Sequence, residues 1–275
     1  FMMTYHDCTF REFTSNYKET TKAILSRAFS MYLKPNLKVF KNSSLTSEDG
    51  IYLKHIGNSS RYLARNDIDT KQFLNLIRDE DLLIKSGEII KNEKGHLITK
   101  TNIQGKNFYI KKYRIKSPFH FFSRLFKKTR AHNSFLSTYW MNAVGIRTAK
   151  PVLLYEESGI LGARDSFFVT EEVRGQRLDD AIGEELDQLR LIGHIVAFFK
   201  RMEWIKFIHG DAKSSNFFLD GNGLVVFDLD SSRKQNSTYF FNKFIKKDKK
   251  RILRSLKGHR SIYDLLSRRL KGKQY

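Results

Sequence analysis

The sequence is short of cysteine and of long apolar runs, and each shortage excludes a class of protein. Its 275 residues include 1 Cys, Cys8, which cannot form an internal disulfide and belongs to no C-x-x-C or Cys/His metal motif. No run approaches the ~18 apolar residues of a membrane span. The best stretch, residues 189–199, is interrupted by Arg190 and His194. Residues 1–7 lack the basic start and apolar run of a signal peptide, so we expect a cytoplasmic, reducing environment.

Acidic residues are also scarce. The chain has 29 Asp and Glu against 50 Lys and Arg, which gives a formal net charge of +21 and a pI near 9.9. Such a charge implies an anionic partner: nucleic acid, an acidic membrane surface or a phosphate-rich substrate. The 40% of hydrophobic residues, with 23 Phe, suffice for a packed core in one two-lobed unit or two small domains.

The most informative stretch is residues 208–230, I-H-G-D-A-K-S-S-N-F-F-L-D-G-N-G-L-V-V-F-D-L-D. Its polar residues have the spacing that phosphoryl transfer from a nucleoside triphosphate requires. Asp211 can orient a hydroxyl acceptor and take its proton. Lys213 can reach the γ-phosphate as its charge redistributes in the transition state. We therefore predict a catalytic loop with Asp211 and Lys213 as catalytic residues.

A metal site is predicted where this loop meets the hairpin that follows it. Two short apolar runs, residues 217–219 and 224–227, are joined by D-G-N-G, which is a strong hairpin signal. The hairpin returns the chain to Asp228, while Asn216 precedes it. Mg²⁺ prefers oxygen ligands and few carboxylates, so Asn216 and Asp228 are the predicted metal ligands. Asp230 is either a second metal ligand or a cap of the turn.

The ordered set H-G-D-x-K-x-x-N, followed twelve residues later by F-D, resembles the H-R-D-x-x-x-x-N and D-F-G elements of the protein-kinase-like fold. The resemblance implies an α+β, bilobal fold with a small antiparallel β-sheet N-lobe and a mainly helical C-lobe. Gly210 stands where kinases regulated by activation-loop phosphorylation commonly have Arg, and no A-P-E-like segment follows. We therefore expect no regulation of that kind.

The N-lobe is expected to contain three antiparallel strands, at residues 82–90, 96–103 and 107–113. The turn that holds Gly95 would lie over the nucleotide phosphates, although a single glycine matches a glycine-rich loop poorly. The last strand, F-Y-I-K-K-Y, resembles the V-A-I-K strand of kinases. Lys111 is therefore the candidate for the contact with the α- and β-phosphates, and Lys112 is the alternative.

The usual partner of that lysine is missing from the sequence. In the kinase fold a glutamate on the next helix holds it, and we expect that helix at residues 129–144. From Lys111 to Tyr155, however, there is no Asp or Glu. The ion pair must come from elsewhere, be replaced by neutral hydrogen bonds, or not exist.

The hinge between the lobes is predicted after a strand at residues 166–170, where the backbone of Glu171 and Val173 would meet the adenine edge. Residues 186–204 predict the core helix beneath the catalytic loop, because apolar side chains recur at helical spacing: Leu189, Ile192, Ile195, Val196 and Phe199. The predicted divisions are an N-terminal extension packing on the kinase core, the N-lobe, and the C-lobe with basic C-terminal helices: residues 1–80, 81–172 and 173–275.

The order of the motifs I-K-K-Y, G-I-x-T-x-K-P-V, E-E-V-x-G, H-G-D-x-K-x-x-N and F-D-L-D resembles the bacterial lipopolysaccharide core kinases. These enzymes phosphorylate heptose or Kdo sugars of the inner core on the cytoplasmic side of the inner membrane. The resemblance covers about residues 81–235. It implies ATP and Mg²⁺ as cofactors, Asp211 as the base, Asn216 and Asp228 as metal ligands, and Lys111 as the nucleotide lysine.

The same resemblance implies a peripheral enzyme whose partners are the lipopolysaccharide core glycolipid and the anionic inner-membrane surface, with no obligate nucleic acid. Residues 233–275 support it, since fifteen Lys and Arg stand there against Asp248 and Asp264 only. Apolar side chains recur there at helical spacing and predict basic amphipathic helices. These helices complete the lobe, lie on an anionic membrane, or do both.

Two other stretches leave their roles open. Residues 18–33 predict a helix with one basic face, and Asp69 and Thr70 predict the cap of a second, short helix. Residues 111–128 interleave cations with aromatic side chains, which either fold into the core or lie on an anionic interface. The alternative functions are a protein Ser/Thr kinase and a nucleic-acid-binding pseudokinase, and a carboxylate partner for Lys111 would argue against the pseudokinase.

Overall fold

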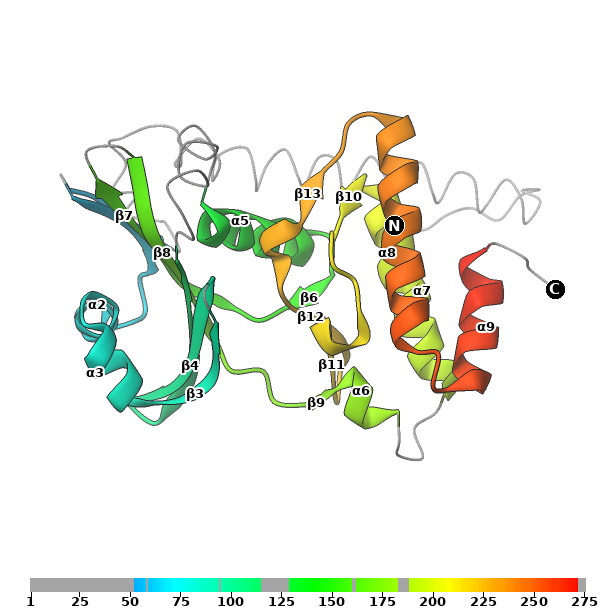
Figure 1. Ribbon diagram of the computed structural model, residues 1–275, viewed down its shortest axis with the longest axis horizontal. Helices are drawn as coiled ribbons and strands as arrows, with labels where there is room; N and C mark the ends of the chain where they lie inside the picture. The colour runs from blue at the N-terminus through cyan, green and yellow to red at the C-terminus, as the bar shows by residue number, and fades with distance from the viewer. Residues whose placement is uncertain are drawn as a thin grey trace, which may run out of the picture. The chain divides into compact units, whose positions relative to one another are not determined.

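A computed structural model describes residues 52–57, 59–93, 95–114, 129–159, 162–182 and 188–271 (Figure 1). They belong to one compact unit, residues 46–275. The helix expected at residues 18–33 and most of the aromatic and cationic stretch, residues 115–128, lie outside the described residues. None of the described helices combines the length and the apolar character needed to cross a bilayer.

The first part of the described chain runs from β1 to β8 and is rich in strands: β1 Tyr52–Ile56, β2 Ser60–Arg65, α2 Thr70–Arg78, α3 Glu80–Lys85, β3 Gly87–Glu93, β4 His96–Ile103, β5 Lys106–Tyr113, α5 Arg130–Ala143, β6 Arg147–Thr148, β7 Pro151–Gly159 and β8 Gly162–Glu171. The second part is richer in helices: β9 Gln176–Arg177, α6 Leu178–Ala181, α7 Gln188–Trp204, β10 Phe207–Ile208, η1 Ser214–Asn216, β11 Phe217–Asp220, β12 Gly223–Val226, η2 Leu229–Ser231, β13 Arg233–Lys234, α8 Thr238–Ser255 and α9 Arg260–Leu270.

The main sheet has seven strands, all antiparallel, in the order β1-β2-β7-β8-β5-β4-β3. The strands predicted at residues 96–103 and 107–113 are present as β4 and β5. Two strands, β1 and β2, come from residues 52–65, for which the sequence predicted no strand. The expectation of an α+β fold with an antiparallel sheet is confirmed.

The strand predicted at residues 82–90 is wrong in its first half. Residues 80–85 form α3 instead, because the Asp79 side chain accepts a hydrogen bond from the backbone N–H of Leu82 and caps a helix. Glu80 and Asp81 in the first turn favour the positive end of the helix dipole. Leu83 is buried by this turn, and only from Gly87 does the chain become a strand.

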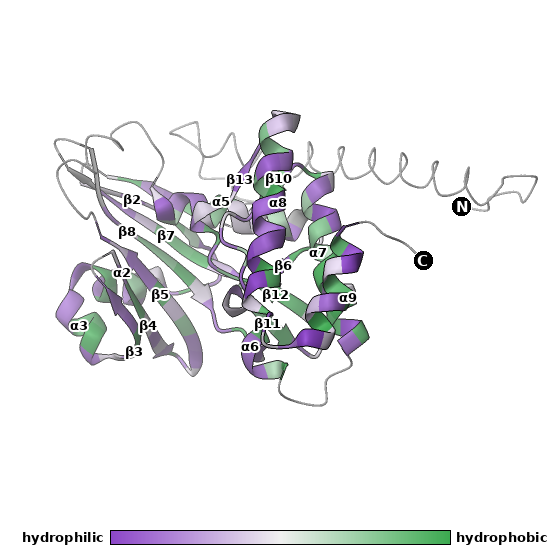
Figure 2. Ribbon diagram, turned by 45° about the vertical axis from the view of Figure 1, so that its right-hand side comes forward, coloured by the Kyte–Doolittle hydropathy of each residue, from purple (hydrophilic) through white to green (hydrophobic). Residues whose placement is uncertain are grey.

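The helical part has its own hydrophobic core, built on α7, with α9 packed against both α7 and α8 (Figure 1). The core helix predicted at residues 186–204 is present, but its predicted inward residue Leu189 is 59% exposed. The buried stripe is instead formed by Leu191, Ile192, Ile195, Phe198, Phe199 and Met202. Figure 2 shows α7 largely green, whereas α8 and α9 carry long purple stretches. Both C-terminal helices still contribute apolar side chains to this core.

The helix α5 is joined to the sheet by a buried carboxylate, Glu156 of β7. Its Oε1 accepts a 2.6 Å hydrogen bond from the hydroxyl of Thr129, the residue that caps α5. Its Oε2 lies 2.8 Å from Nε of Arg61 and 3.6 Å from Nδ1 of His132. Burial alone would raise the pKa of Glu156, but these contacts, led by His132, lower it to about 2. Glu156 thereby fixes the start of α5 on the sheet.

Replacement of Glu156 by Gln tests this link through the pH dependence of stability. The folded-state pKa is depressed from an ordinary value of 4.5 to about 2. The carboxylate therefore contributes about 3 kcal/mol above pH ~4.5, and this contribution is lost as the pH falls toward ~2. In urea unfolding, we expect the wild type to lose about 2 kcal/mol more than Glu156→Gln between pH 5 and pH 3. Glu88→Gln, at an exposed position, should follow the wild type, and equal slopes for all three proteins would contradict the link.

Candidate active site

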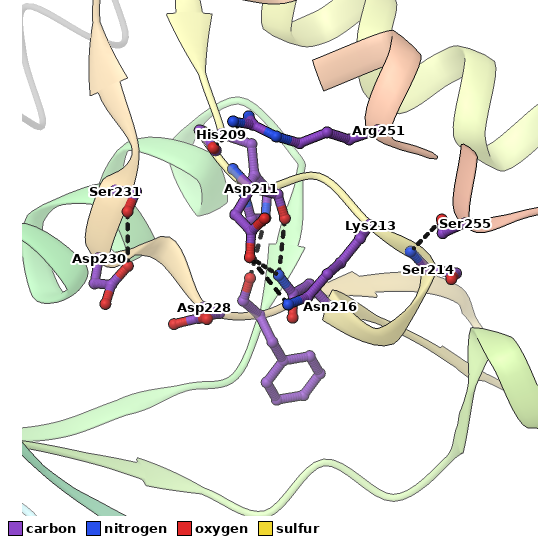
Figure 3. Close-up of polar contacts among 12 residues, drawn as sticks. His209, Asp211, Lys213, Ser214, Asn216, Asp228, Asp230, Ser231, Arg251 and Ser255 are labelled. Carbon is purple, nitrogen blue, oxygen red and sulfur yellow. Dashed lines mark hydrogen bonds and ion pairs between the residues drawn. The ribbon is translucent and has the colours of Figure 1, made fainter. Parts of the chain in front are cut away.

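The predicted catalytic loop follows β10 and is supported by the fully buried imidazole of His209 (Figure 3). Nε2 of His209 lies 3.0 Å from the carbonyl oxygen of Phe227, and Nδ1 lies 3.3 Å from the backbone nitrogen of Asp211. This pattern assigns a neutral ring that donates from Nε2 and accepts at Nδ1. Burial lowers the pKa of His209, although neighbouring carboxylates, chiefly that of Asp248, oppose it. The loop is thus tied to the end of β12.

The three polar residues of the loop come together at its tip (Figure 3). Asn216 donates from Nδ2 to the carbonyl oxygen of Asp211 at 2.8 Å and to its carboxylate Oδ2 at 3.2 Å. Nζ of Lys213 lies 3.2 Å from the same Oδ2. The side chains of Asp211 and Lys213 are 39% and 48% exposed, so an acceptor can approach both. Because the Asn216 amide nitrogen is held by Asp211, its Oδ1 is the atom left for a cation.

Asp228 and Lys111 of β5 form a direct ion pair, with 2.5 Å between Nζ and Oδ1. Burial opposes the charge on Lys111, but Tyr113, Asp228 and Asp230 outweigh burial and raise the pKa of the ammonium. Burial also acts to raise the pKa of Asp228, and Lys111 holds it below its ordinary value. Among the described residues, Asp228 therefore supplies the carboxylate that the following helix lacks.

The backbone of Asp228 is unusual, with φ 56° and ψ 57°. This left-handed conformation is uncommon outside glycine, and strain of this kind gathers at functional sites. The alternative nucleotide lysine, Lys112, lies elsewhere, with Nζ 2.7 Å from Glu80 and 2.9 Å from Asp165. Lys111 is thus the lysine of β5 that pairs with the predicted metal ligand.

A cavity of about 500 Å³ lies between the seven-stranded sheet and the catalytic loop. Five predicted site residues line it: Lys111, Val173, Lys213, Asn216 and Asp228. Apolar and aromatic groups form much of the remaining wall: Ile90, Ile98, Tyr109, Phe168, Val226 and Leu229. The volume and the mixture of apolar walls with a few converging charges are typical of a nucleotide-sized ligand site.

Two residues predicted to contact the nucleotide, Glu171 and Gly95, are not part of the cavity lining. The predicted contact of Glu171 is through its backbone, whose N–H donates to the carbonyl oxygen of Lys150 at 3.0 Å. Gly95 is buried in the turn between β3 and β4, and it is the next residue, His96, that lines the cavity. Roles for Glu171, Gly95 and Val173 toward a nucleotide stay predictions; of the three, Val173 lines the cavity.

The sequence analysis missed a second buried carboxylate, Asp248 of α8, that holds the catalytic loop. Its Oδ2 accepts hydrogen bonds from the backbone N–H groups of His209 and Gly210, both at 3.0 Å. Arg251 donates from Nη1 to Oδ1 of Asp248 at 2.8 Å and also to the carbonyl oxygen of Gly210. Asp248 is 0% exposed. A sequence signal existed, since this lone acid occupies the apolar face of a basic helix, where a carboxylate needs partners.

Gly210 is required where it stands. Its φ is +89°, and a Cβ there would lie 2.7 Å from the carbonyl oxygen of Ser231. Any other residue would be strained in backbone conformation and would collide with that carbonyl. This supplies a physical reason for glycine in place of the arginine of phosphorylation-regulated kinases.

Asp230 is occupied by a contact with α5. Its carboxylate accepts hydrogen bonds from Arg130, the first residue of α5, and from the hydroxyl of Ser231 at 3.1 Å. The side-chain amide of Asn133 donates to the carbonyl oxygens of Asp230 and Ser232, at 2.7 and 2.8 Å. The helix α5 therefore holds the turn just after Asp228 by a cation and an amide, where other kinases use a glutamate on the lysine.

A family model described as the lipopolysaccharide kinase (Kdo/WaaP) family matches residues 80–270. The chain belongs to this family. It is therefore a kinase, as the ordered motifs predicted. A solved structure titled "WaaP in complex with acyl carrier protein" matches with a TM-score of 0.57 and 17% identity, over 78% of this chain and 90% of that chain. At this identity the match supports the kinase-like fold alone. No curated protein sequence matches the chain.

Membership of the family implies ATP as the phosphate donor, and the donor atoms at the cavity fit the Mg²⁺ that accompanies ATP. Asn216 offers an amide oxygen and Asp228 a carboxylate oxygen, both at the cavity wall. Within the described ranges, no three His, Cys, Asp or Glu side chains gather into a metal cage. Such a sparse set suits Mg²⁺, which keeps water and phosphate oxygens among its ligands.

Asp248→Ala tests the anchor of the catalytic loop. The change leaves two buried backbone N–H groups without their acceptor and removes one of the two acceptors of Arg251, so we expect a loss of about 3–5 kcal/mol in the free energy of unfolding. Urea unfolding followed by circular dichroism measures it. Asp264→Ala, on the exposed surface of α9, is the matched control and should stay within about 0.5 kcal/mol of the wild type. A loss below about 1 kcal/mol for Asp248→Ala would show that the anchor contributes little.

Arg130→Met tests whether α5 positions the turn after Asp228. We expect the kinase to lose roughly 10- to 100-fold in kcat with little change in KM for ATP, because the metal-ligand turn moves while the rest of the cavity remains. The double variant Arg130→Asp, Asp230→Arg restores the pair with reversed charges and should regain part of kcat. Arg254→Met removes an exposed cation of α8 and serves as the control. Unchanged kcat in Arg130→Met would refute this positioning role.

Proposed function

We propose that the protein transfers the γ-phosphate of ATP to a sugar hydroxyl, on heptose or Kdo, of the lipopolysaccharide inner core. The observation that carries this proposal is that Asn216, Asp228 and Lys111 line one cavity, with Lys111 paired to Asp228 and Asn216 hydrogen-bonded to the adjacent Asp211. Family membership supports the lipopolysaccharide class of acceptor. The structure of a WaaP protein with acyl carrier protein supports the same fold.

In the proposed reaction, Asp211 orients the acceptor hydroxyl and takes its proton as the oxygen bonds to the γ-phosphorus. The bond between that phosphorus and the bridging oxygen breaks, and ADP leaves with the electron pair. Lys213, beside Asp211, stabilises the charge that develops on the transferred group. Lys111 exchanges part of its contact with Asp228 for the α- and β-phosphates.

Asn216 and Asp228 would hold Mg²⁺, which neutralises charge on the β- and γ-phosphate oxygens when bound. The neutral imidazole of His209 holds the loop in place and adds no positive charge to the site, since burial lowers its pKa. Val173 lies at the cavity wall where the adenine would be bound, and its backbone groups are the proposed hinge contacts.

A protein Ser/Thr kinase is less well supported by the structure. After η2 only residues 232–237, including the short β13, separate the metal-ligand turn from α8. This leaves little chain for the activation and peptide-docking segments of protein kinases. A nucleic-acid-binding pseudokinase agrees poorly with the kinase family to which the chain belongs and with the presence of Asp211, Asn216 and Asp228 together.

The proposal is tested by transfer of labelled γ-phosphate from ATP, with Mg²⁺, to purified dephosphorylated lipopolysaccharide. Asp211→Asn removes the base while preserving size, and we expect roughly a 10³-fold fall in kcat with ATP binding retained. Asp264→Asn is the matched control and should transfer label normally.

Two acceptors separate the sugars in this assay: one with Kdo alone on lipid A, and one that also carries heptose. Label in the first identifies Kdo, and label only in the second identifies heptose. Transfer that is undiminished in Asp211→Asn would reject Asp211 as the base. An absence of label from both acceptors, with ATP bound, would reject the inner core as the substrate.

A further inference from the structure

The first turns of α8 carry an exposed aromatic and cationic surface that the kinase site does not use. Tyr239 is 72% exposed and Phe240 is 48% exposed, although both belong to a helix whose opposite face is in the core. The Tyr239 and Phe240 rings are 5.3 Å apart, and Phe240 stacks on Phe244 at 6.5 Å. Exposed aromatic residues that touch one another mark an interaction site more strongly than scattered ones.

Cations surround these rings. The guanidinium of Arg233 lies 4.6 Å from the centre of the Phe244 ring, and Nζ of Lys247 lies 5.7 Å from it. Lys243 is exposed on the same part of α8. Between Arg233 and Lys247 the sequence contains no acidic residue. We call Arg233, Tyr239, Phe240, Lys243, Phe244 and Lys247 the aromatic-basic patch.

The helical spacing separates this patch from the core-facing side of α8. Residues 240, 244 and 247 follow one another at steps of four and three, so they share a face. The buried residues Phe241, Ile245, Asp248 and Ile252 form the neighbouring stripe, about 100° further round the helix. Of the patch residues, Phe244 is half-buried and also packs against the core, whereas Tyr239, Phe240, Lys243 and Lys247 are exposed. The hold of Asp248 on the catalytic loop does not use the patch.

We propose that the aromatic-basic patch docks the enzyme on an anionic phospholipid surface, with the rings at the headgroup level and the cations on lipid phosphates. Aromatic side chains with a polar or cationic rim favour the membrane interface, and each cation adds attraction to anionic lipid. The choice of lipid over an acidic protein rests on the proposed function, because an acceptor carried on a glycolipid brings the enzyme to a membrane.

The position of the patch suits this role. From Phe240 to Asp248 there are eight residues of helix, or about 12 Å along its axis. Asp248 contacts the backbone of Gly210, the residue before the proposed base. Docking at the patch therefore keeps the catalytic loop within about 1–2 nm of the surface, which a sugar attached to a membrane lipid can span.

The test measures binding of the purified full chain to vesicles by flotation, without ATP or acceptor. Vesicles of phosphatidylethanolamine with about one-third phosphatidylglycerol are compared with vesicles of phosphatidylcholine. We expect binding to the anionic vesicles only, and a roughly tenfold loss of affinity in the double variant Tyr239→Ser, Phe240→Ser. Leu53→Ser removes an apolar side chain of similar exposure, 48%, on β1 and should bind as the wild type does.

The double variant should unfold at the wild-type urea concentration and should phosphorylate a delipidated, soluble core oligosaccharide at the wild-type rate. Absence of vesicle binding by the wild type, or equal binding by the wild type and the double variant, would overturn the docking surface. Because the flotation assay involves no phosphotransfer, patch-dependent binding without sugar phosphorylation would refute the proposed function and leave the surface standing.

Discussion

The arrangement of the site depends on one buried carboxylate, that of Asp248. An ionised group without solvent is costly unless donors surround it, and the effective penalty is several kcal/mol. Here two backbone N–H groups of the catalytic loop and Arg251 supply the donors. The requirement works in both directions, because those backbone groups are themselves buried polar atoms that need an acceptor. The loop conformation that presents Asp211 is therefore specified by a residue of α8, 37 positions further along the chain.

The second constraint is the absence of Asp and Glu between Lys111 and Tyr155, the segment that contains α5. Without a glutamate on α5, the sheet lysine pairs with Asp228, and α5 reaches the same region by a cation of its own, Arg130. The two cations lie close to one ring, with Lys111 5.0 Å and Arg130 4.9 Å from the centre of Tyr113. The helix α5 and the metal-ligand turn are thus still joined by an ion pair, but here the helix supplies the cation, Arg130, and the turn supplies the carboxylate, Asp230. Among the described residues, four cations line the cavity, Lys91, Lys111, Arg177 and Lys213, against the single acid Asp228, and this excess of positive charge favours a polyphosphate.

The sequence predicted best where one short stretch determines both structure and chemistry. The hairpin of β11 and β12 and the membership of the lipopolysaccharide kinases were read from contiguous motifs and are confirmed. The catalytic roles in the loop stay predictions. Predictions failed where long-range packing decides. Residues 82–84 are three consecutive apolar residues, which a buried strand can also have, yet the cap by Asp79 makes a helix. Leu189 fits the apolar period of α7, but its side chain lies outside the packed core and is exposed. Strands β1 and β2 form only because β7 offers an edge for β2.

The partner of Lys111 and the partners of Asp248 could not be identified from the sequence for the same reason: each contact joins groups more than thirty positions apart. The C-terminal helix α8 shows how a structural role and a surface role can be separated on one helix. A basic amphipathic helix was predicted either to complete the core or to meet an anionic surface. On α8 the two roles occupy different faces, since one face buries Phe241 and Asp248 and the other exposes Phe240 and Lys247. Because α8 is a continuous helix, a partner bound to the exposed side of its first turns has a fixed position relative to the catalytic loop, which Asp248 holds from the buried side. No change of conformation is needed.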